Sequence, residues 1–163
     1  MSLLMRQIIL FGWILLGLNV FSSYGQEGGS LTFEQLDSLQ AIEKRPVLIF
    51  IHTSWCRYCQ AMKHTTFQNQ DVMNWLDSAF YRVSLDAETL SDITVREKTF
   101  RYQPTGNGVG QHELAQQLGA IEGILTYPTL CFLNTSYEII YQQAGFLSAS
   151  QLLSLLQTIH DHY

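Results

Sequence analysis

The chain has 163 residues, of which 47% are hydrophobic, and its formal charge is −5 at pH 7. This length predicts one domain with its own hydrophobic core. The acidic balance excludes the broad basic surface that binds nucleic acid, and so mild an acidity identifies no ligand.

The first 25 residues have the features of an export signal. Arg6 precedes the apolar run IILFGWILLGLNVF, and small residues follow at Ser23 and Gly25. The run is shorter than the roughly 20 apolar residues of a membrane-spanning helix, which favours a cleaved signal peptide. We therefore expect residues 1–25 to be a signal peptide, with an N-terminal membrane anchor as the alternative. Residues 26–163 would then form the folded domain, periplasmic or secreted, or held at the inner membrane.

The segment LTFEQLDSLQAIEKR predicts an amphipathic helix that Thr32 or Ser30 could cap. Its apolar residues recur on one helical face: Leu31, Leu36, Leu39 and Ile42. The next segment, RPVLIFIHT, is a short run rich in β-branched residues. It predicts a buried central strand in a mixed or parallel sheet.

Two helical pieces follow this strand, CQAMKHTTF and QDVMNWLDSAF. The second should direct four apolar residues inward: Val72, Trp75, Leu76 and Phe80. FYRVSLDAE then alternates as a strand does, and the pattern weakens from about Ala87 to Gly110. Within that stretch, RYQPTGNGVGQ predicts a loop because it contains Pro104 and three glycines.

The last third of the chain predicts a helix, two strands and a final helix. HELAQQLGAIEGI is helical in pattern, and TYPTLCFLN and EIIYQQAGF form a hairpin of strands around a turn. Ser148 could cap the last helix, whose apolar stripe has four members: Leu152, Leu155, Leu156 and Ile159. This order of elements predicts an α/β domain with a parallel portion and an antiparallel edge.

The chain has three cysteines, which is an odd number and too few for a domain held together by disulfides. Cys56 and Cys59 are therefore available for chemistry. Cys131 lies on an apolar strand, three residues after Pro128. We expect a buried, inert thiol there, with a regulatory thiol as the alternative.

The pair Cys56-Arg57-Tyr58-Cys59 lies where the buried strand turns into a helix. The N-terminal end of a helix favours a thiolate, and the Arg57 cation adds to that effect. Cys56 is the predicted nucleophile, and Cys59 would resolve the mixed disulfide. Trp55 would form a docking surface for a partner, with mere packing as the alternative. Arg57 and Tyr58 would also bind the substrate, although Tyr58 could be only the second filler of the motif.

Two other interpretations of this motif stay open. One is a static disulfide. The other is a metal site, because His52 and His64 flank the cysteines and supply two more donors. His52 belongs to the strand and His64 lies two helical turns past Cys56, so their convergence on one ion is not favoured. We therefore predict no metal and interpret His52 as a neighbour that tunes the thiols.

The motif VLIFIHTSWCRYC, together with RVSLDAE, TYPTLCFL and AGFLSASQLLSLL, resembles the thioredoxin-like superfamily over Leu31 to His160. WCRYCQAMKHTTFQNQDVMNWL is most similar to exported thioredoxin-related proteins and to the C-terminal domain of transmembrane thiol:disulfide interchange proteins. The resemblance implies a central mixed sheet flanked by helices, with an extended loop and helix insertion before the cis-proline strand. It also implies that the Tyr127–Pro128 bond is cis and faces the cysteines, and that the backbone at Tyr127 binds an incoming peptide.

The sequence departs from that family in two places. Phe50 lies six residues before Cys56, where many thioredoxins have a buried aspartate that accepts a proton from the resolving cysteine. Glu97, Glu113 or water could take that proton instead. The segment from Thr99 to Glu122 is longer than a minimal thioredoxin connection and should project near Pro128, where it could influence partner choice.

The function implied by the resemblance is thiol–disulfide exchange on protein disulfides outside the cytoplasm, in the reducing direction. Cys56 and Cys59 would carry it in a monomer without organic cofactor or metal. The partners would be a disulfide-bearing client protein and a membrane or soluble thiol that supplies electrons. The alternatives are a binding module with this fold and a metallochaperone that uses the cysteine pair with the nearby histidines.

Overall fold

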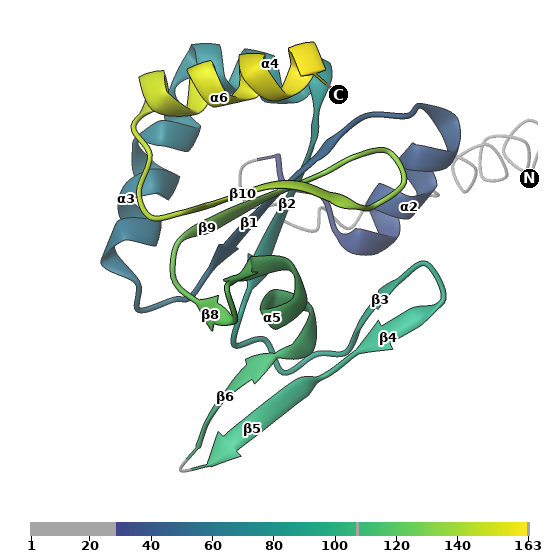
Figure 1. The fold of residues 1–163 in the computed structure, drawn as a ribbon, viewed down its shortest axis with the longest axis vertical. Coiled ribbons are helices and arrows are strands. Elements are labelled where there is room, and N and C mark those ends of the chain that lie inside the picture. Colours follow the sequence, from purple (N-terminus) through teal and green to yellow (C-terminus); the bar gives the residue numbers. More distant parts are fainter. Residues whose placement is uncertain (1–28, 107, 163) are drawn as a thin grey trace, which may run out of the picture.

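The computed structural model describes residues 29–106 and 108–162 (Figure 1). The signal or anchor predicted for residues 1–25 lies outside these ranges. Within them, no helix has the length and apolar character needed to span a membrane. The elements are, in chain order, α2 (Phe33–Ile42), β1 (Val47–His52), α3 (Arg57–His64), the 3-10 turn η1 (Thr66–Gln68), α4 (Gln70–Ala79), β2 (Tyr81–Asp86), β3 (Ile93–Val95), β4 (Lys98–Phe100), β5 (Tyr102–Gly106), β6 (Val109–His112), α5 (Glu113–Gly119), β7 (Ala120–Ile121), β8 (Ile124–Leu125), β9 (Thr129–Leu133), β10 (Ile139–Ala144) and α6 (Ala149–His162).

The centre of the fold is a four-stranded mixed sheet in the order β10-β9-β1-β2. β1 runs parallel to β2 and antiparallel to β9, and β9 is antiparallel to β10. All six residues of β1 are buried, as expected for a strand with neighbours on both sides and helices on both faces. The predicted mixed sheet, with its parallel portion and antiparallel edge, is confirmed.

Helices cover both faces of the sheet (Figure 1). α2 and α5 pack on the face that contains Val47, Ile49 and Ile51. α3, α4 and α6 pack on the opposite face, which contains Leu48 and Phe50. Because successive side chains of a strand point to opposite faces, alternate residues of β1 contribute to two separate cores. Cys56 and Cys59 belong to the second core, which we call the cysteine-side core.

The start of α2 follows the prediction, but its buried face differs. Thr32 caps the helix: its hydroxyl accepts from the Gln35 N–H, and the Gln35 side chain accepts from the Thr32 N–H. Ile42, predicted to face inward, is 84% exposed, and Gln40 is buried instead. The Gln40 amide donates to the Arg45 carbonyl and accepts from the Arg45 N–H, so it closes the turn between α2 and β1.

Most of the predicted inward residues of α4 and α6 are buried. In α4 and at its end these are Val72, Leu76 and Phe80, and in α6 they are Leu152, Leu156 and Ile159. Trp75 and Leu155 are only half-buried, because they lie at the margins of these stripes. Ser148 caps α6 as predicted, through reciprocal hydrogen bonds with Gln151.

The predicted loop from Arg101 to Gln111 is wrong, because this segment contains a β-hairpin. β5 and β6 pair antiparallel, with Tyr102 opposite His112. Figure 1 shows this hairpin projecting beyond the central sheet. The glycine and proline content of the segment indicated a loop. In the structure, however, Gly110 allows β6 to pack closely against Tyr102 and Gln103 of β5. A Cβ atom on Gly110 would lie 2.6 Å from the Tyr102 ring and would overlap the Gln103 carbonyl oxygen.

The base of the hairpin is held by polar contacts from the start of α5. The Glu113 carboxylate accepts from the Arg101 N–H and from the Gln103 amide, and the first of these bonds holds the pKa of Glu113 below its usual value. His112, the last residue of β6, is fully buried. Its Nδ1 accepts from the Leu114 N–H and caps α5, while Nε2 lies 3.2 Å from the Ser91 carbonyl oxygen.

We expect the substitution Gly110→Ala to open this hairpin. The new methyl group would meet a backbone oxygen that cannot move without loss of strand pairing, at a cost of about 1–3 kcal/mol of local stability. Hydrogen exchange of the β5 and β6 amides measures this effect. Val109→Ala, at an exposed position of β6, is the matched control. Unchanged protection in the Gly110 variant would contradict the packing described here.

Candidate functional site

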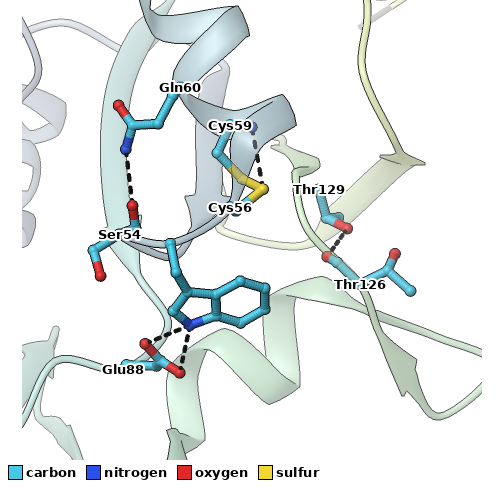
Figure 2. Close-up of a disulfide and its surroundings, with 8 residues drawn as sticks. Ser54, Cys56, Cys59, Gln60, Glu88, Thr126 and Thr129 are labelled. Atoms are coloured by element: carbon cyan, nitrogen blue, oxygen red, sulfur yellow. Dashed lines mark hydrogen bonds between the residues drawn. A yellow bond between two sulfur atoms is a disulfide. The ribbon is translucent and has the colours of Figure 1, made fainter.

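The two cysteines lie at the turn from β1 into α3. Cys56 is the N-cap of α3, and its Sγ atom accepts a hydrogen bond of 3.1 Å from the Cys59 N–H. The two residues form a disulfide, with Cα atoms 5.2 Å apart. Gln60 braces the turn by donating to the Ser54 carbonyl oxygen, as Figure 2 shows. The predicted pair is therefore assembled, within one turn of helix.

The electrostatic surroundings favour a negative charge on the sulfur of Cys56. Unpaired N–H groups and the positive end of the helix dipole point toward an N-cap side chain. The first turn of α3 contains Arg57 and no acidic residue. In the disulfide form Cys56 is 5% exposed and Cys59 is fully buried. Cys56 is thus the more accessible sulfur, although less accessible than an exposed nucleophile would be.

A cis peptide bond joins Tyr127 to Pro128. Register brings it to the cysteines, because Thr129 pairs with Ile51 near the end of β1. The segment is braced by a hydrogen bond from the Thr129 hydroxyl to the Thr126 carbonyl oxygen (Figure 2). Tyr127 packs against the core that contains both cysteines. The structure thus brings the predicted cis-proline segment to the cysteine pair.

Three predicted binding residues lie on the surface around the disulfide. Trp55 is 65% exposed and Tyr58 is 67% exposed, and Arg57 is exposed as well. The Trp55 ring contacts the Tyr127 ring edge-to-face, with 5.9 Å between centroids. Trp55 therefore connects the cysteine turn to the cis-proline segment.

Glu88 is a site residue that the sequence analysis missed. Its carboxylate accepts a hydrogen bond from Trp55 Nε1, with both oxygens at 3.0 Å (Figure 2). The sequence contained a signal for this contact, namely the position of Glu88 just after a predicted strand. That strand, β2, is the parallel neighbour of β1. Residues that follow such strands meet at the same edge of the sheet, where functional groups gather. Glu88 follows β2, which ends at Asp86, as Trp55 and Cys56 follow β1.

The Tyr127 hydroxyl is buried and has no hydrogen-bond partner among the described residues. Its burial, followed by the carboxylates of Glu88 and Asp86, raises the pKa of Tyr127 to about 12. The phenol is therefore neutral at physiological pH. It adds an uncharged polar group next to Trp55, whose ring Tyr127 contacts.

Phe50 occupies the position of the buried aspartate found in many thioredoxins. It contacts Phe67 edge-to-face at 4.9 Å and stacks on His52 at 5.1 Å, within the cysteine-side core. The two glutamates considered as substitute proton acceptors are engaged or placed in other parts of the fold. Glu113 accepts hydrogen bonds at the base of the β5–β6 hairpin, and Glu97 lies in the turn between β3 and β4. Glu88 is the carboxylate that hydrogen-bonds to the cysteine turn.

The flanking histidines do not join the cysteines in one cluster. His52 is buried, with Nε2 2.8 Å from the Ser84 hydroxyl, whereas His64 is exposed at the end of α3. Among residues 29–106 and 108–162, no group of three or more His, Cys, Asp or Glu side chains is arranged to hold a metal ion.

Cys131 lies in β9 and is fully buried as a free thiol. Burial raises the pKa of Cys131 to about 12. The position in the core and the raised pKa agree with the inert thiol predicted from the sequence.

Comparison with known families identifies the fold. The model of the thioredoxin-like domain family matches residues 33–160. The chain belongs to this family. The family match and the cis-proline beside the cysteine pair bear out the resemblance inferred from the sequence.

Individual relatives of this thioredoxin-like chain are distant. Spermatogenesis-associated protein 20 of Rattus norvegicus is 31% identical over 68 residues, which cover 42% of this chain and only 8% of that protein. Among solved structures, a thioredoxin-fold protein from Helicobacter pylori has a TM-score of 0.54 at 16% identity and covers 86% of this chain and 83% of its own. DsbH oxidoreductase has a TM-score of 0.53 at 14% identity, covering 93% and 99%. At these identities the structures show a shared fold.

The hydrogen bond between Trp55 and Glu88 should be visible in solution. We expect Glu88→Ala to shift the indole N–H resonance of Trp55 and to increase its exchange with water several-fold, because the carboxylate acceptor is lost. Two-dimensional NMR of the oxidised chain measures both effects, with Trp55→Phe to assign the signal. Glu122→Ala, which removes another surface carboxylate, should leave the signal in place.

Cys131 should resist alkylation in the folded, oxidised chain. With a pKa near 12, only about one thiol in 10⁴ is ionised at pH 8, and the core excludes the reagent. The labelling rate with iodoacetamide should stay far below that of the urea-unfolded chain. From pH 8 to pH 10 it should keep rising with no plateau, since the thiolate fraction still increases. Rapid labelling of the native chain would show that Cys131 is accessible.

Proposed function

We propose that this protein is a thiol–disulfide oxidoreductase that reduces protein disulfides outside the cytoplasm. The observation that carries the proposal is the Cys56–Cys59 disulfide at the N-terminal end of α3, beside the cis-Pro128 segment. Such a pair can alternate between dithiol and disulfide without other change to the fold. The exchange involves sulfur atoms of protein thiols alone, so it requires no organic cofactor or metal.

The first step begins from the reduced pair. The Cys56 thiolate, stabilised by the Cys59 N–H and the end of the helix, attacks one sulfur of a client disulfide. A mixed disulfide forms between Cys56 and the client, and the other client sulfur leaves as a thiolate that takes up a proton. The client strand next to its cysteine would lie along the backbone at Tyr127, with Trp55, Arg57 and Tyr58 around it.

In the second step the sulfur of Cys59 loses its proton and attacks Cys56. The Cys56–Cys59 disulfide forms again, and the client leaves with its second thiol. Two electrons have then passed from the pair to the client. The client thiols have taken up two protons, equal to the one that Cys59 lost and the one that Cys56 had released to solvent on forming its thiolate. A thiol electron donor, either a membrane protein or a soluble one, would then reduce the pair for another cycle.

The location and partners rest on the sequence. The signal-like segment at residues 1–25 supports export to the periplasm or beyond, with anchorage to the inner membrane as the alternative. The formal charge of −5 does not support a nucleic-acid partner. We infer a monomer, in which the exposed side chains around the disulfide remain available to the client.

The test is the reduction potential of the pair, measured in Cys131→Ser after removal of metal, by equilibration with glutathione and dithiothreitol. We expect a value near the thioredoxin range of about −270 mV. A value near about −120 mV would identify an oxidant and contradict the proposed direction. Absence of disulfide formation, with zinc or copper retained, would contradict the redox function and favour a metallochaperone.

Turnover separates the enzyme from a binding module. With dithiothreitol as electron source, Cys56→Ser should lose reduction of a disulfide-bonded test protein. Cys59→Ser should accumulate the mixed disulfide through Cys56, because the resolving sulfur is missing. Cys131→Ser should keep full activity and serves as the control. Client binding that survives Cys56→Ser, combined with no turnover by the unmodified chain, would identify a binding module.

A further inference from the structure

A cavity of about 260 Å³ opens beside β2, the edge strand of the central sheet. The strands β1 and β2 form its floor, the end of α3 and η1 form one wall, and the segment before α2 forms another. We call it the β2 cavity. Among the described residues that line it, three are basic, three are polar without charge and none is acidic; the six polar ones are Lys63, His64, Arg82, Ser30, Gln68 and Ser84.

The alternation of β2 directs two of these polar side chains toward the cavity. Tyr81 and Leu85 pack in the core on the opposite face of the sheet. Because successive side chains of a strand point to opposite faces, Arg82 and Ser84 point to the side of the cysteine-side core. The Leu31 N–H donates to the Arg82 carbonyl oxygen at 2.8 Å, which holds the segment before α2 along the outer edge of β2.

The Arg82 guanidinium is a partly buried cation at the floor of the cavity. Its Cζ atom lies over the Phe67 ring, 5.4 Å from the centroid. Among residues 29–106 and 108–162, no carboxylate forms an ion pair with it. Burial lowers the pKa of Arg82, and the Asp77 carboxylate opposes this effect only in part. A cation removed from water without an ionic partner favours the binding of an anion.

Two more basic side chains reach the cavity from the last turn of α3. Lys63 is half-buried there, and His64 is exposed. Basic residues at the end of a helix also offset its dipole, and this effect alone would explain both positions. It does not explain Arg82, which belongs to β2 and meets the other two only through the fold. Convergence of cations from two elements on one cavity is the observation that requires a ligand.

We propose that the β2 cavity binds the phosphate group of a small organic phosphate monoester. A phosphate monoester has a charge of about −1.5 to −2 at pH 7 and three strong acceptor oxygens. Arg82 supplies the forked donor that matches such an oxyanion, and Lys63 supplies a second positive charge. The Ser84 hydroxyl and the Gln68 amide add uncharged donors from the floor and the wall.

The cavity has room and apolar surface for the organic part of the ligand. Its volume of about 260 Å³ is near the lower end of small-molecule pockets, which begin at roughly 300 Å³. The rings of Phe50 and Phe67 line it and would contact a small aromatic or aliphatic group. This inference does not rest on the exchange function, because the cavity lies at the C-terminal end of α3 and the disulfide at the N-terminal end.

The experiment is calorimetric titration of the oxidised chain at physiological ionic strength with phenyl phosphate, inorganic phosphate and benzoate. We expect phenyl phosphate to bind with one-to-one stoichiometry, about tenfold more tightly than inorganic phosphate, because its ring buries apolar surface. Benzoate should bind about tenfold more weakly than phenyl phosphate, because it lacks the second charge and the third oxygen. Absence of saturable binding, or equal affinity for all three compounds, would overturn the proposal.

Variants of the basic residues test where the phosphate binds. Arg82→Gln should weaken binding of phenyl phosphate at least about tenfold, and Lys63→Gln about threefold. Arg82→Lys keeps the charge without the fork and should give an intermediate affinity. If Arg82→Gln unfolds the chain, Lys63→Gln and Arg82→Lys still decide. The control is Lys98→Gln, which removes one positive charge beside Phe100, a residue of the core on the opposite face. An equal loss in this control would show non-specific attraction and overturn the proposal.

A carboxylate of the chain itself is the rival occupant. Glu27 stands two residues before Gly29 in the sequence, at the start of the segment that leads to the cavity. Unchanged binding of phenyl phosphate in Glu27→Gln supports a free ligand. Binding that appears only in Glu27→Gln would assign the cavity to this carboxylate and refute the proposal. Amide NMR shifts on titration should be confined to the lining of the cavity, with Gln68 and Ser84 among them, and shifts confined to other surfaces would also refute it.

Discussion

The site depends on the pairing of β1 with strands on both sides. Parallel pairing with β2 brings the segment after Asp86 to the edge where β1 turns into α3. Antiparallel pairing with β9 brings the cis-Pro128 segment to the same edge from the other side. Residues from three distant parts of the chain therefore meet around one helix terminus. A shift of one residue in either ladder would turn every side chain of the shifted strand to the opposite face. The register that buries the core is therefore also the register that assembles the site.

The cysteine turn has an apolar interior and a polar surface contact. Phe50 fills the core beneath the cysteines, and among the described residues no carboxylate is buried there. Glu88 approaches from the surface and bonds to Trp55. A buried carboxylate would carry a large desolvation cost, whereas an acid bonded to an indole at the surface does not. Glu88, the carboxylate that hydrogen-bonds to the cysteine turn, is half-buried and so keeps part of its contact with solvent. The buried Tyr127 hydroxyl stays neutral because its pKa is about 12.

The insertion before the cis-proline strand has two parts with different positions. The β5–β6 hairpin projects beyond the central sheet and is held at its base by Glu113 and His112 (Figure 1). The β7–β8 turn instead continues directly into Thr126 and Tyr127, and so it borders the cysteine site. The extra residues between β2 and β9 thus extend the surface near the disulfide and leave the central sheet unchanged. Loops on a rigid scaffold commonly supply specificity in this way.

The sequence by itself determined the order of the main elements, the mixed sheet, and the assignment of Cys56, Cys59 and Pro128 to one site. These features follow from local periodicity, from short motifs and from the family resemblance. The tertiary structure alone decided which residues surround the pair. Glu88 reaches Trp55 only because β1 and β2 are adjacent. His112 is buried at the junction of β6 and α5, where its backbone N–H bonds to the Ala87 carbonyl oxygen and its ring lies beside the Ser91 carbonyl oxygen. The hairpin itself was interpreted as a loop, because glycine content does not distinguish a flexible segment from one where Tyr102 needs space. Periodicity records which face of an element is apolar, but contacts between distant segments depend on strand order and register, which no single segment encodes.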